Sequence, residues 1–295
     1  MELNIVKPSV ELMIPTDYEE HIAKCARICY ASDKSNNSAL IKRLTRDNHL
    51  SMFRHWTRYF LVPIDKIDKM LIDVETIFNL FSSEYCRFKL DEKYYYFVCN
   101  EQYYIEHYED IKYLNNYLVS EEEFTSVSST GKSLRRITFK VVTQISITRE
   151  LNRVSPNNIA EQSTRYVNFT VKFGSICAPH WMLNEVPNNP TTIDEYDLEH
   201  LKDYDNYPLK TYINSCFNNF RDYNYLVSNN LLQPQDARDV LPLATTTVAA
   251  YTYFIDEWQN IINLRYHGTT GKPHPNAKII AGLIRDEMNN LGYKL

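Results

Sequence analysis

Glycine is scarce in this chain, and its scarcity limits how the chain could bind a phosphate group. Only 6 of the 295 residues are glycine, where average usage would give about 20. Nucleotide enzymes commonly surround the phosphates with the backbone of a glycine-rich loop, such as G-x-G-x-x-G or G-x-x-x-x-G-K-[ST]. Neither pattern occurs here. A phosphate bound by this protein would therefore be held by side chains.

The overall charge argues against a broad nucleic-acid surface. The formal net charge is -5, whereas nucleic-acid binding needs lysines and arginines clustered over one face. No apolar run is long enough to span a membrane. The first residues also lack the basic segment and apolar stretch of a signal peptide. We therefore expect a cytoplasmic protein that binds neither nucleic acid nor membranes.

The cysteines predict neither a metal site nor a disulfide framework. None of the six is part of a C-x-x-C pair, and a chain of this length without a signal peptide favours buried, reduced thiols. The six are Cys25, Cys29, Cys86, Cys99, Cys177 and Cys216.

The spacing of apolar residues predicts an α+β fold, with a mixed or antiparallel sheet flanked by long helices. Helices are expected over 17–32, 37–47, 66–90, 206–231, 245–265 and 275–291. Strands are expected over 57–64, 94–98 and 167–171, and residues 137–147 suit either a strand or the start of a helix. An exposed loop is expected around 120–133 and a polar connection at 185–205. The first helix should begin with a capping box of Thr16 and Glu19.

Nothing in the sequence divides the chain into separate domains. We find neither an internal repeat nor a clean linker. A single domain over residues 1–295 is therefore expected.

Polar side chains are densest over residues 148–166, which contain three arginines, two glutamates, two serines and three asparagines. Arginine offers a rigid fork for phosphate or carboxylate. Serine adds a hydroxyl donor, and glutamate can accept from a sugar hydroxyl or a ring N–H. These residue types suit both a solvated loop and a binding site for an anionic ligand.

The same stretch resembles the signature of the flavin-dependent thymidylate synthases, R-H-R-x7-S followed by x-R-Y. Arg153 and the Ser163-Thr164-Arg165-Tyr166 run keep its spacing. Four further blocks resemble family motifs in the same order. They are Ala26–Ser32 (A-R-x-C-Y-x-S), Asn48–Trp56 (G-H-x-S-x-x-E-H), Pro234–Pro242 (P-Q-x-A-R-x-V-L-P), and Asn263–Arg265 (x-L-R) with His274–Asn276 (A-H-P-Q).

The chain resembles a divergent member of that family. Val154 stands where the signature has histidine, Ser155 where it has its second arginine, and Arg54 where the second block has glutamate. Residues 66–135 are longer than in compact members, which predicts an insertion there. The fold implied by the resemblance is that of the thymidylate synthase-complementing proteins.

The resemblance implies a role for each matching residue. The nucleotide dUMP would be bound by Glu150, Ser163, Thr164, Arg165, Arg238 and Arg265, and Arg265 would also be catalytic by polarising the uracil. The flavin FAD would be bound by Ser51, His55, Arg153, Asn260 and His274. Simpler structural roles are the alternatives. Arg238 and Arg265 could pair with Asp236 or Asp239, the histidines could be core or capping residues, and Asn260 could be a solvated helix residue.

The function implied is the reductive methylation of dUMP to dTMP. Methylenetetrahydrofolate would donate the carbon, and NADPH would reduce the FAD. A homotetramer with active sites at subunit interfaces is implied, and no protein nucleophile. Two alternatives stay open: another flavin-dependent alkylation of a pyrimidine nucleotide, for example hydroxymethylation, or a degenerate relative that binds nucleotide without turnover.

Overall fold

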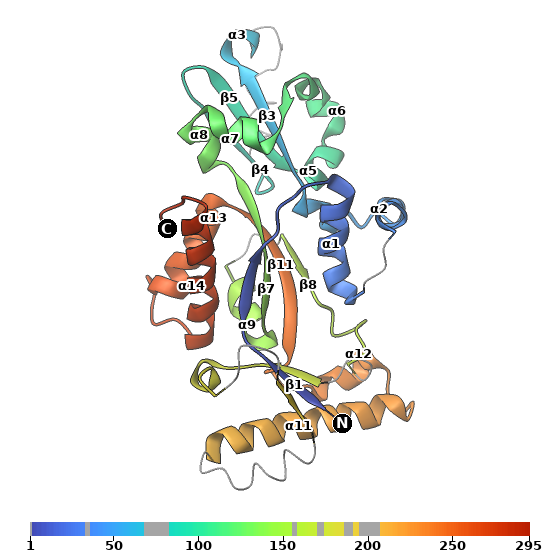
Figure 1. Cartoon of the computed structure of the whole chain (residues 1–295). Helices are drawn as coiled ribbons and strands as arrows, with labels where there is room; N and C mark the ends of the chain where they lie inside the picture. Colours follow the sequence, from blue (N-terminus) through green and yellow to red (C-terminus); the bar gives the residue numbers. More distant parts are fainter. Residues whose placement is uncertain are drawn as a thin grey trace.

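Three β-sheets follow one another along an elongated molecule (Figure 1). The structure is a computed structural model that describes residues 2–32, 36–67, 83–154, 158–169, 174–185, 191–194 and 207–295. In the order of Figure 1 we call the three sheets the lower, the central and the upper sheet.

The central sheet is antiparallel and is built on two long strands. In spatial order it contains β2 (Ser9–Leu12), β7 (Arg136–Gln144), β11 (Thr246–Phe254) and β8 (Ile159–Glu161). β7 and β11 pair over nine residues, from Thr246 opposite Gln144 to Phe254 opposite Arg136. Both are buried along almost their whole length, which places the centre of the core here.

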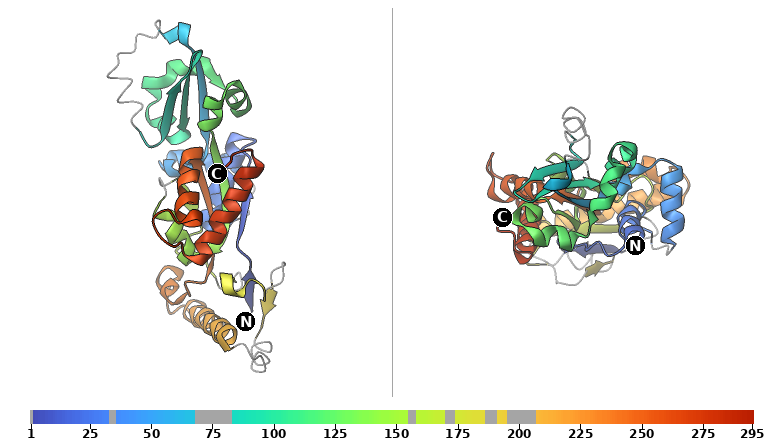
Figure 2. Two further views of the ribbon diagram at one scale, coloured as in Figure 1. Left: turned by 90° about the vertical axis from the view of Figure 1, so that its left-hand side faces the viewer. Right: turned by 90° about the horizontal axis from the view of Figure 1, so that it is seen from above.

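Helices cover both faces of the central sheet (Figures 1 and 2). One face packs against α9 (Ile145–Asn152), α13 (Ile255–Ile262) and α14 (Pro275–Asn290), the other against α1 (Tyr18–Tyr30). Successive side chains of a strand point to opposite faces. Accordingly Tyr251 and Tyr253 contribute to the cluster formed with α13 and α14, whereas Ala250 packs against Cys25 of α1. A second helix, α2 (Asn37–Arg46), packs on α1.

The upper sheet carries its own apolar core. Its order is β4 (Cys86–Leu90), β5 (Tyr94–Asn100), β3 (Thr57–Pro63) and β6 (Leu118–Val119). Several short helices surround it: η1 (Leu50–His55), α3 (Ile64–Ile67), α5 (Glu101–Glu106), α6 (Tyr108–Ile111), η2 (Lys112–Tyr117), α7 (Glu121–Val127) and α8 (Ser129–Ser133). The segment predicted to be an insertion, 66–135, supplies β4, β5 and β6. Phe254 at the end of β11 joins a cluster with Tyr59 and Tyr96, which connects the upper sheet to the central one.

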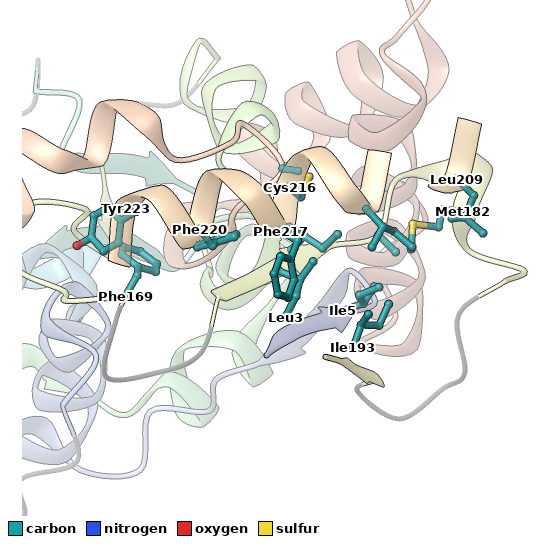
Figure 3. Close-up of a cluster of buried hydrophobic side chains, with 14 of the residues drawn as sticks. Leu3, Ile5, Phe169, Met182, Ile193, Leu209, Cys216, Phe217, Phe220 and Tyr223 are labelled. Carbon is teal, nitrogen blue, oxygen red and sulfur yellow. The ribbon is translucent and has the colours of Figure 1, made fainter. Parts of the chain in front are cut away.

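The lower sheet packs against one long helix. It has the order β10 (Thr191–Ile193), β1 (Leu3–Val6) and β9 (Gly174–Cys177), with β1 and β9 parallel. The helix α11 (Tyr207–Ser228) buries Ile213, Phe217 and Phe220, which recur at helical spacing. Figure 3 shows Phe217 beside Leu3 and Phe220 further along α11 toward Tyr223, all in one buried cluster. The short helices η3 (His180–Met182), α12 (Pro234–Ala237) and η5 (Arg238–Val240) complete this end.

The α+β class is confirmed, together with most of the regular elements. The predicted helices 17–32, 37–47, 206–231 and 275–291 correspond to α1, α2, α11 and α14, and the strands 57–64 and 94–98 to β3 and β5. Residues 137–147 hold most of β7 and the first turn of α9.

The helix predicted over 245–265 is wrong in its first half, which forms β11. Thr246–Phe254 is rich in β-branched and aromatic residues and is buried on both faces. A strand of that kind shows no alternation of apolar and polar residues. Only α13 and the segment after it are helical.

Three other predictions fail in part. Within 66–90, Cys86–Leu90 is strand β4, and 68–82 lie outside the described residues. The loop expected at 120–133 consists of α7 and α8, whose N-caps are Ser120 and Ser128. Residues 167–169 belong to no strand, and 170–171 lie outside the described part.

Two details of the prediction also change. The polar connection at 185–205 contains β10, and most of its other residues are not described. The N-cap of α1 is Asp17 and not Thr16, because the Asp17 carboxylate accepts the backbone N–H of Glu20 at 2.8 Å.

Candidate functional site

A tight turn after β8 holds the residues of the S-x-R-Y motif. The Ser163 hydroxyl oxygen accepts the backbone N–H groups of Arg165 at 3.1 Å and of Tyr166 at 3.3 Å. The Ser163 N–H donates to the carbonyl of Cys29, at the end of α1, at 3.0 Å. The hydroxyl therefore shapes the turn, and α1 anchors it.

Arg165 extends from this turn toward α12. Its Nε donates to the Gln235 side-chain oxygen at 3.1 Å, and its guanidinium lies 5.2 Å from the ring centre of Tyr166. Gln235 is three residues before Arg238, so the two arginines lie on adjoining segments. Both arginines are exposed. We call Ser163, Thr164, Arg165 and Arg238 the β8 group.

Arg265 is held against Glu150 on α9. It belongs to a π-helical turn, η6 (Asn263–His267), between α13 and α14, and such turns occur frequently at functional sites. Its Nε donates to the Glu150 carbonyl at 2.9 Å, and its Nη2 lies 3.6 Å from the Glu150 carboxylate. The guanidinium is thus fixed along one edge. We call these two residues the α9 pair.

The ion pairs considered as structural alternatives do not form among the described residues. Arg265 pairs with Glu150, and Arg238 has no salt bridge with Asp236 or Asp239 there.

The α9 pair and the β8 group lie on different sides of α9. Thr148 and Asn152, one turn apart, both hydrogen-bond the carboxylate of Glu161 at the end of β8. Glu150 is two residues from Thr148 and two from Asn152, which corresponds to a rotation of about 200° around the helix. Its side chain therefore points away from Glu161 and lies against Arg265. No hydrogen bond or ion pair between described residues joins the two sets.

Two residues of this region carry interactions that the sequence reasoning did not assign. Glu161 accepts from the Thr148 hydroxyl at 2.7 Å, the Asn152 amide at 3.3 Å and the Thr247 hydroxyl at 3.4 Å. Gln235 accepts from Arg165. Two sequence features could have indicated these residues. Glu161 is the acidic residue of a short, otherwise apolar strand, and Gln235 is the glutamine of the P-Q-x-A-R motif.

His55, expected to bind FAD, lies inside the protein. It is 2% exposed, and its Nδ1 is 2.8 Å from the Thr252 hydroxyl. The hydrogen bonds continue from the Thr252 hydroxyl to the Thr138 hydroxyl at 2.8 Å, and from the Thr138 hydroxyl to Nε2 of His21 at 3.3 Å. Burial lowers the pKa of His55 to about 3 and that of His21 to about 4. Both rings are therefore neutral at pH 7. Within one chain, the His55 side chain is too deeply buried for a ligand to contact it.

The other residues expected to bind FAD are exposed. Within the described part of the chain, the side chains of Ser51, Arg153 and Asn260 make no hydrogen bond or ion pair. His274 caps α14, where its Nδ1 accepts the Asn276 N–H at 3.2 Å. It lines a cavity of about 810 Å³ between α11 and the start of α14. This donor chemistry fits phosphates and ring carbonyls, with His55 as the exception.

The signature position that holds valine is part of the core. Val154 packs, half-buried, against the cluster beneath α13 and α14. It has no polar atom in its side chain to replace the histidine. Ser155 lies outside the described residues.

Other kinds of site were searched for in the described part of the chain. Within it, no cluster of three or more His, Cys, Asp or Glu could hold a metal ion, and no helix has the length and apolarity to cross a membrane. All six cysteines are free, and all but Cys29 are buried.

Comparisons with known proteins give similar solved structures and one matching family model. Among solved structures, the chain is similar to the UMP/dUMP methylase PolB of Streptomyces cacaoi bound with 5-Br dUMP. The TM-score is 0.44 at 16% identity, over 99% of this chain and 93% of that chain. It is also similar to thymidylate synthase X of Helicobacter pylori with FAD and dUMP. There the TM-score is 0.37 at 17% identity, over 61% of this chain and 83% of that chain.

A search of curated proteins gave no match. The family model described as thymidylate synthase complementing protein matches residues 98–290, which is more than half of the chain. That range contains the polar stretch 148–166 and both arginine motifs that follow it. The chain belongs to the thymidylate synthase complementing protein family.

Proposed function

We propose that this protein is a flavin-dependent methylase that converts dUMP to dTMP. The observation that carries the proposal is the meeting of three motif blocks at the turn after β8. Ser163 is anchored to Cys29 of the first block, and Arg165 is bonded to Gln235 of the P-Q-x-A-R block, 70 residues away in sequence. Family membership supports the same reading.

The nucleotide phosphate is assigned to the β8 group. A phosphate monoester is close to a dianion at neutral pH, and charge-assisted hydrogen bonds from guanidinium groups are the strong class of such bonds. Arg165 and Arg238 supply two guanidinium groups, and Thr164 adds a hydroxyl. Such a site needs no glycine-rich loop, in agreement with the six glycines of the chain.

The uracil ring is assigned to the α9 pair. The Arg265 Nε is bound to the Glu150 carbonyl, so the remaining N–H groups can donate to a ring carbonyl, while the Glu150 carboxylate accepts a ring N–H. Fixed donors of this kind act by orientation and by stabilising charge that develops on the ring. Ser163 is not a nucleophile in this proposal, because its oxygen already accepts two backbone N–H groups and no histidine contacts it among the described residues.

FAD is proposed as the cofactor, held by Ser51, Arg153, Asn260 and His274. When bound, it supplies the reducing equivalents for the transferred carbon, which methylenetetrahydrofolate donates, and NADPH is the external reductant. This assignment is supported by the donor groups of Ser51, Arg153 and Asn260, which have no partner among the described residues. Because α9 separates the two nucleotide-binding sets, we propose a homotetramer whose active sites lie between subunits.

The apolar Val154 favours one second candidate. A valine packed against the core cannot supply the polar contact of a histidine, which favours a different handling of the one-carbon unit. The second candidate is another flavin-dependent alkylation of the pyrimidine, for example hydroxymethylation.

The direct test is turnover by the purified protein with 5-tritiated dUMP, methylenetetrahydrofolate, FAD and NADPH. We expect tritium release and a product with the mass of dTMP. A hydroxymethylated product would select the second candidate. Bound dUMP without tritium release or a new product would contradict both and favour a non-catalytic relative.

Binding provides a second test. The Arg165→Ala variant should bind dUMP about 10- to 100-fold more weakly, because a hydrogen bond to a charged group contributes about 1.5–3 kcal/mol. Arg221→Ala, an exposed arginine of α11 beside Asp222, is the control and should bind normally. Equal affinities of both variants would contradict the phosphate assignment.

A further inference from the structure

A second cavity lies between α1 and the central sheet. It has a volume of about 830 Å³, and its wall includes Arg27, Ala31 and Gln162. Gln162 immediately precedes Ser163, and its N–H donates to the carbonyl of Val248, another wall residue, at 2.8 Å. We call this cavity the α1 pocket. The cavity therefore ends one residue before the turn that carries Ser163 of the β8 group, on the side of α1.

The charges that line the α1 pocket cancel in pairs, with one exception. Lys24 lies 2.6 Å from Glu20, and Lys140 lies 2.7 Å from Glu11. The guanidinium of Arg27 has no ion pair or hydrogen bond with any described residue. Arg27 is thus the lining cation whose charge is not balanced within the described chain.

The remaining titratable group of the wall adds no charge. His21 also lines the α1 pocket, and burial lowers its pKa to about 4. It is therefore neutral at pH 7, so the net charge of the lining is positive and is carried by Arg27. An arginine fork of this kind matches the geometry of a phosphate or a carboxylate.

The backbone that carries Arg27 is fixed in place. The carbonyls of the last turn of α1 accept the N–H groups of Ala31 and Ser32. Ala31 adopts the left-handed conformation, with φ of 46°, which ends the helix. Two residues after Arg27, the Cys29 carbonyl accepts the Ser163 N–H, which connects the end of α1 to the β8 group.

We propose that Arg27 binds an anionic group, a phosphate or a carboxylate, of a ligand that occupies the α1 pocket beside the β8 group. The inference rests on the proposed function, which offers three sources of such a group. They are the phosphate of dUMP, the diphosphate of FAD and the glutamate carboxylates of the folate.

The test compares Arg27→Gln with the double variant Glu20→Gln/Lys24→Gln by calorimetry on the purified full chain. The double variant is the matched control, since it alters the same helix and the same pocket wall but removes a paired positive and negative charge, which leaves the net charge of the lining unchanged. Each anionic ligand is measured beside an uncharged counterpart: dUMP with deoxyuridine, FAD with riboflavin, and folate with a pterin that lacks the glutamate.

We expect Arg27→Gln to lower the affinity for one anionic ligand about tenfold or more, the usual loss when a hydrogen bond to a charged group is removed. The affinity for its uncharged counterpart should be unaffected, and Glu20→Gln/Lys24→Gln should leave every affinity unchanged. The ligand pair that responds identifies the source of the anion. Arg27→Lys, which keeps the charge but not the fork, should show an intermediate loss and guards against a folding defect in Arg27→Gln.

Wild-type affinity of both Arg27 variants for all three anionic ligands would overturn the inference and leave the proposed function intact. An equal loss in Glu20→Gln/Lys24→Gln would also overturn it. If the wild-type protein itself binds none of the three ligands, the proposed function fails together with this inference.

Discussion

Among single residues, Arg265 combines constraint with free hydrogen-bond donors. Its Nε is occupied by the Glu150 carbonyl, and the side chain is only 17% exposed. Restricting a guanidinium in this way lowers the conformational entropy that a ligand must otherwise remove. Arg165, by contrast, is exposed and is tethered through Gln235. We therefore assign reaction chemistry to Arg265 and binding to Arg165.

Arg265→Ala should lower kcat about 10²–10³-fold, the usual loss when one fixed donor to a developing charge is removed. Single-turnover kinetics with dUMP would measure it. Arg285→Ala is the control, because Arg285 lies nearby on α14, 4.1 Å from the Tyr266 ring centre, outside the proposed site. A comparable loss of kcat in Arg285→Ala would show that local packing, and not Arg265, limits the rate.

The buried histidines predict how stability depends on pH. Burial holds the pKa of His21 at about 4 and that of His55 at about 3, whereas an unfolded histidine titrates near 6.5. Between these values the unfolded chain binds more protons, so the free energy of unfolding falls as the pH falls. The loss should begin below about pH 6.5 and reach a few kcal/mol by about pH 4.

Urea denaturation at a series of pH values would measure this slope. His21→Gln should flatten it between pH 6.5 and 4, whereas His49→Gln, at an exposed position, should leave it unchanged. An identical slope in His21→Gln and wild type would contradict the assignment.

Among the helices and strands, those with one buried and one solvent-exposed face could be predicted from the sequence most reliably. α1, α2 and α14 each have one apolar face, so their spacing could be read from the sequence. β11 could not, because it is buried on both faces and lacks alternation. α7 and α8 are short and polar, so they lack an apolar face that predicts a helix. Their N-cap residues, Ser120 and Ser128, were the helix signal present in the sequence.

The contact between β9 and α11 is a close approach that only glycine permits. A Cβ added to Gly174 would lie 2.5 Å from Cγ of Phe220 and 2.9 Å from both Cδ atoms. Gly174→Ala should therefore lower the free energy of unfolding by about 1–3 kcal/mol, the usual cost of overpacking. The denaturation midpoint measures it.

A second substitution tests the cause of that loss. Phe220→Leu removes the ring that the new methyl group would meet. The double variant should lose less stability than the sum of the two single variants. Strict additivity, or an unchanged midpoint in Gly174→Ala, would contradict the close-packing explanation.

Across the whole molecule, the motifs indicate which residues belong to the candidate site but not how they are arranged. Glu150, Arg165 and Arg265 were picked out by the resemblance of the ordered blocks to the family motifs. Their separation by α9 depends on which side of that helix each residue occupies, and this follows from the pairing of β8 with β11 and from the hydrogen bonds to Glu161. Long-range strand pairing leaves no local signal in the sequence.

This separation leads to a prediction for mixed oligomers. If each active site combines the α9 pair of one subunit with the β8 group of another, Arg265→Ala subunits, which turn over slowly, and Arg165→Ala subunits, which bind dUMP weakly, complement each other when dUMP is kept well below the Kd of the Arg165→Ala variant. In randomly mixed oligomers, about one quarter of the sites would then contain both intact sets.

Co-expression of the two variants in equal amounts should restore about that fraction of wild-type tritium release. Co-expression of Arg165→Ala with Arg238→Ala, both altered in the β8 group, should restore none. Absence of activity in the first mixture, with oligomers formed, would mean that one chain supplies both sets, and the proposed interface site would be wrong.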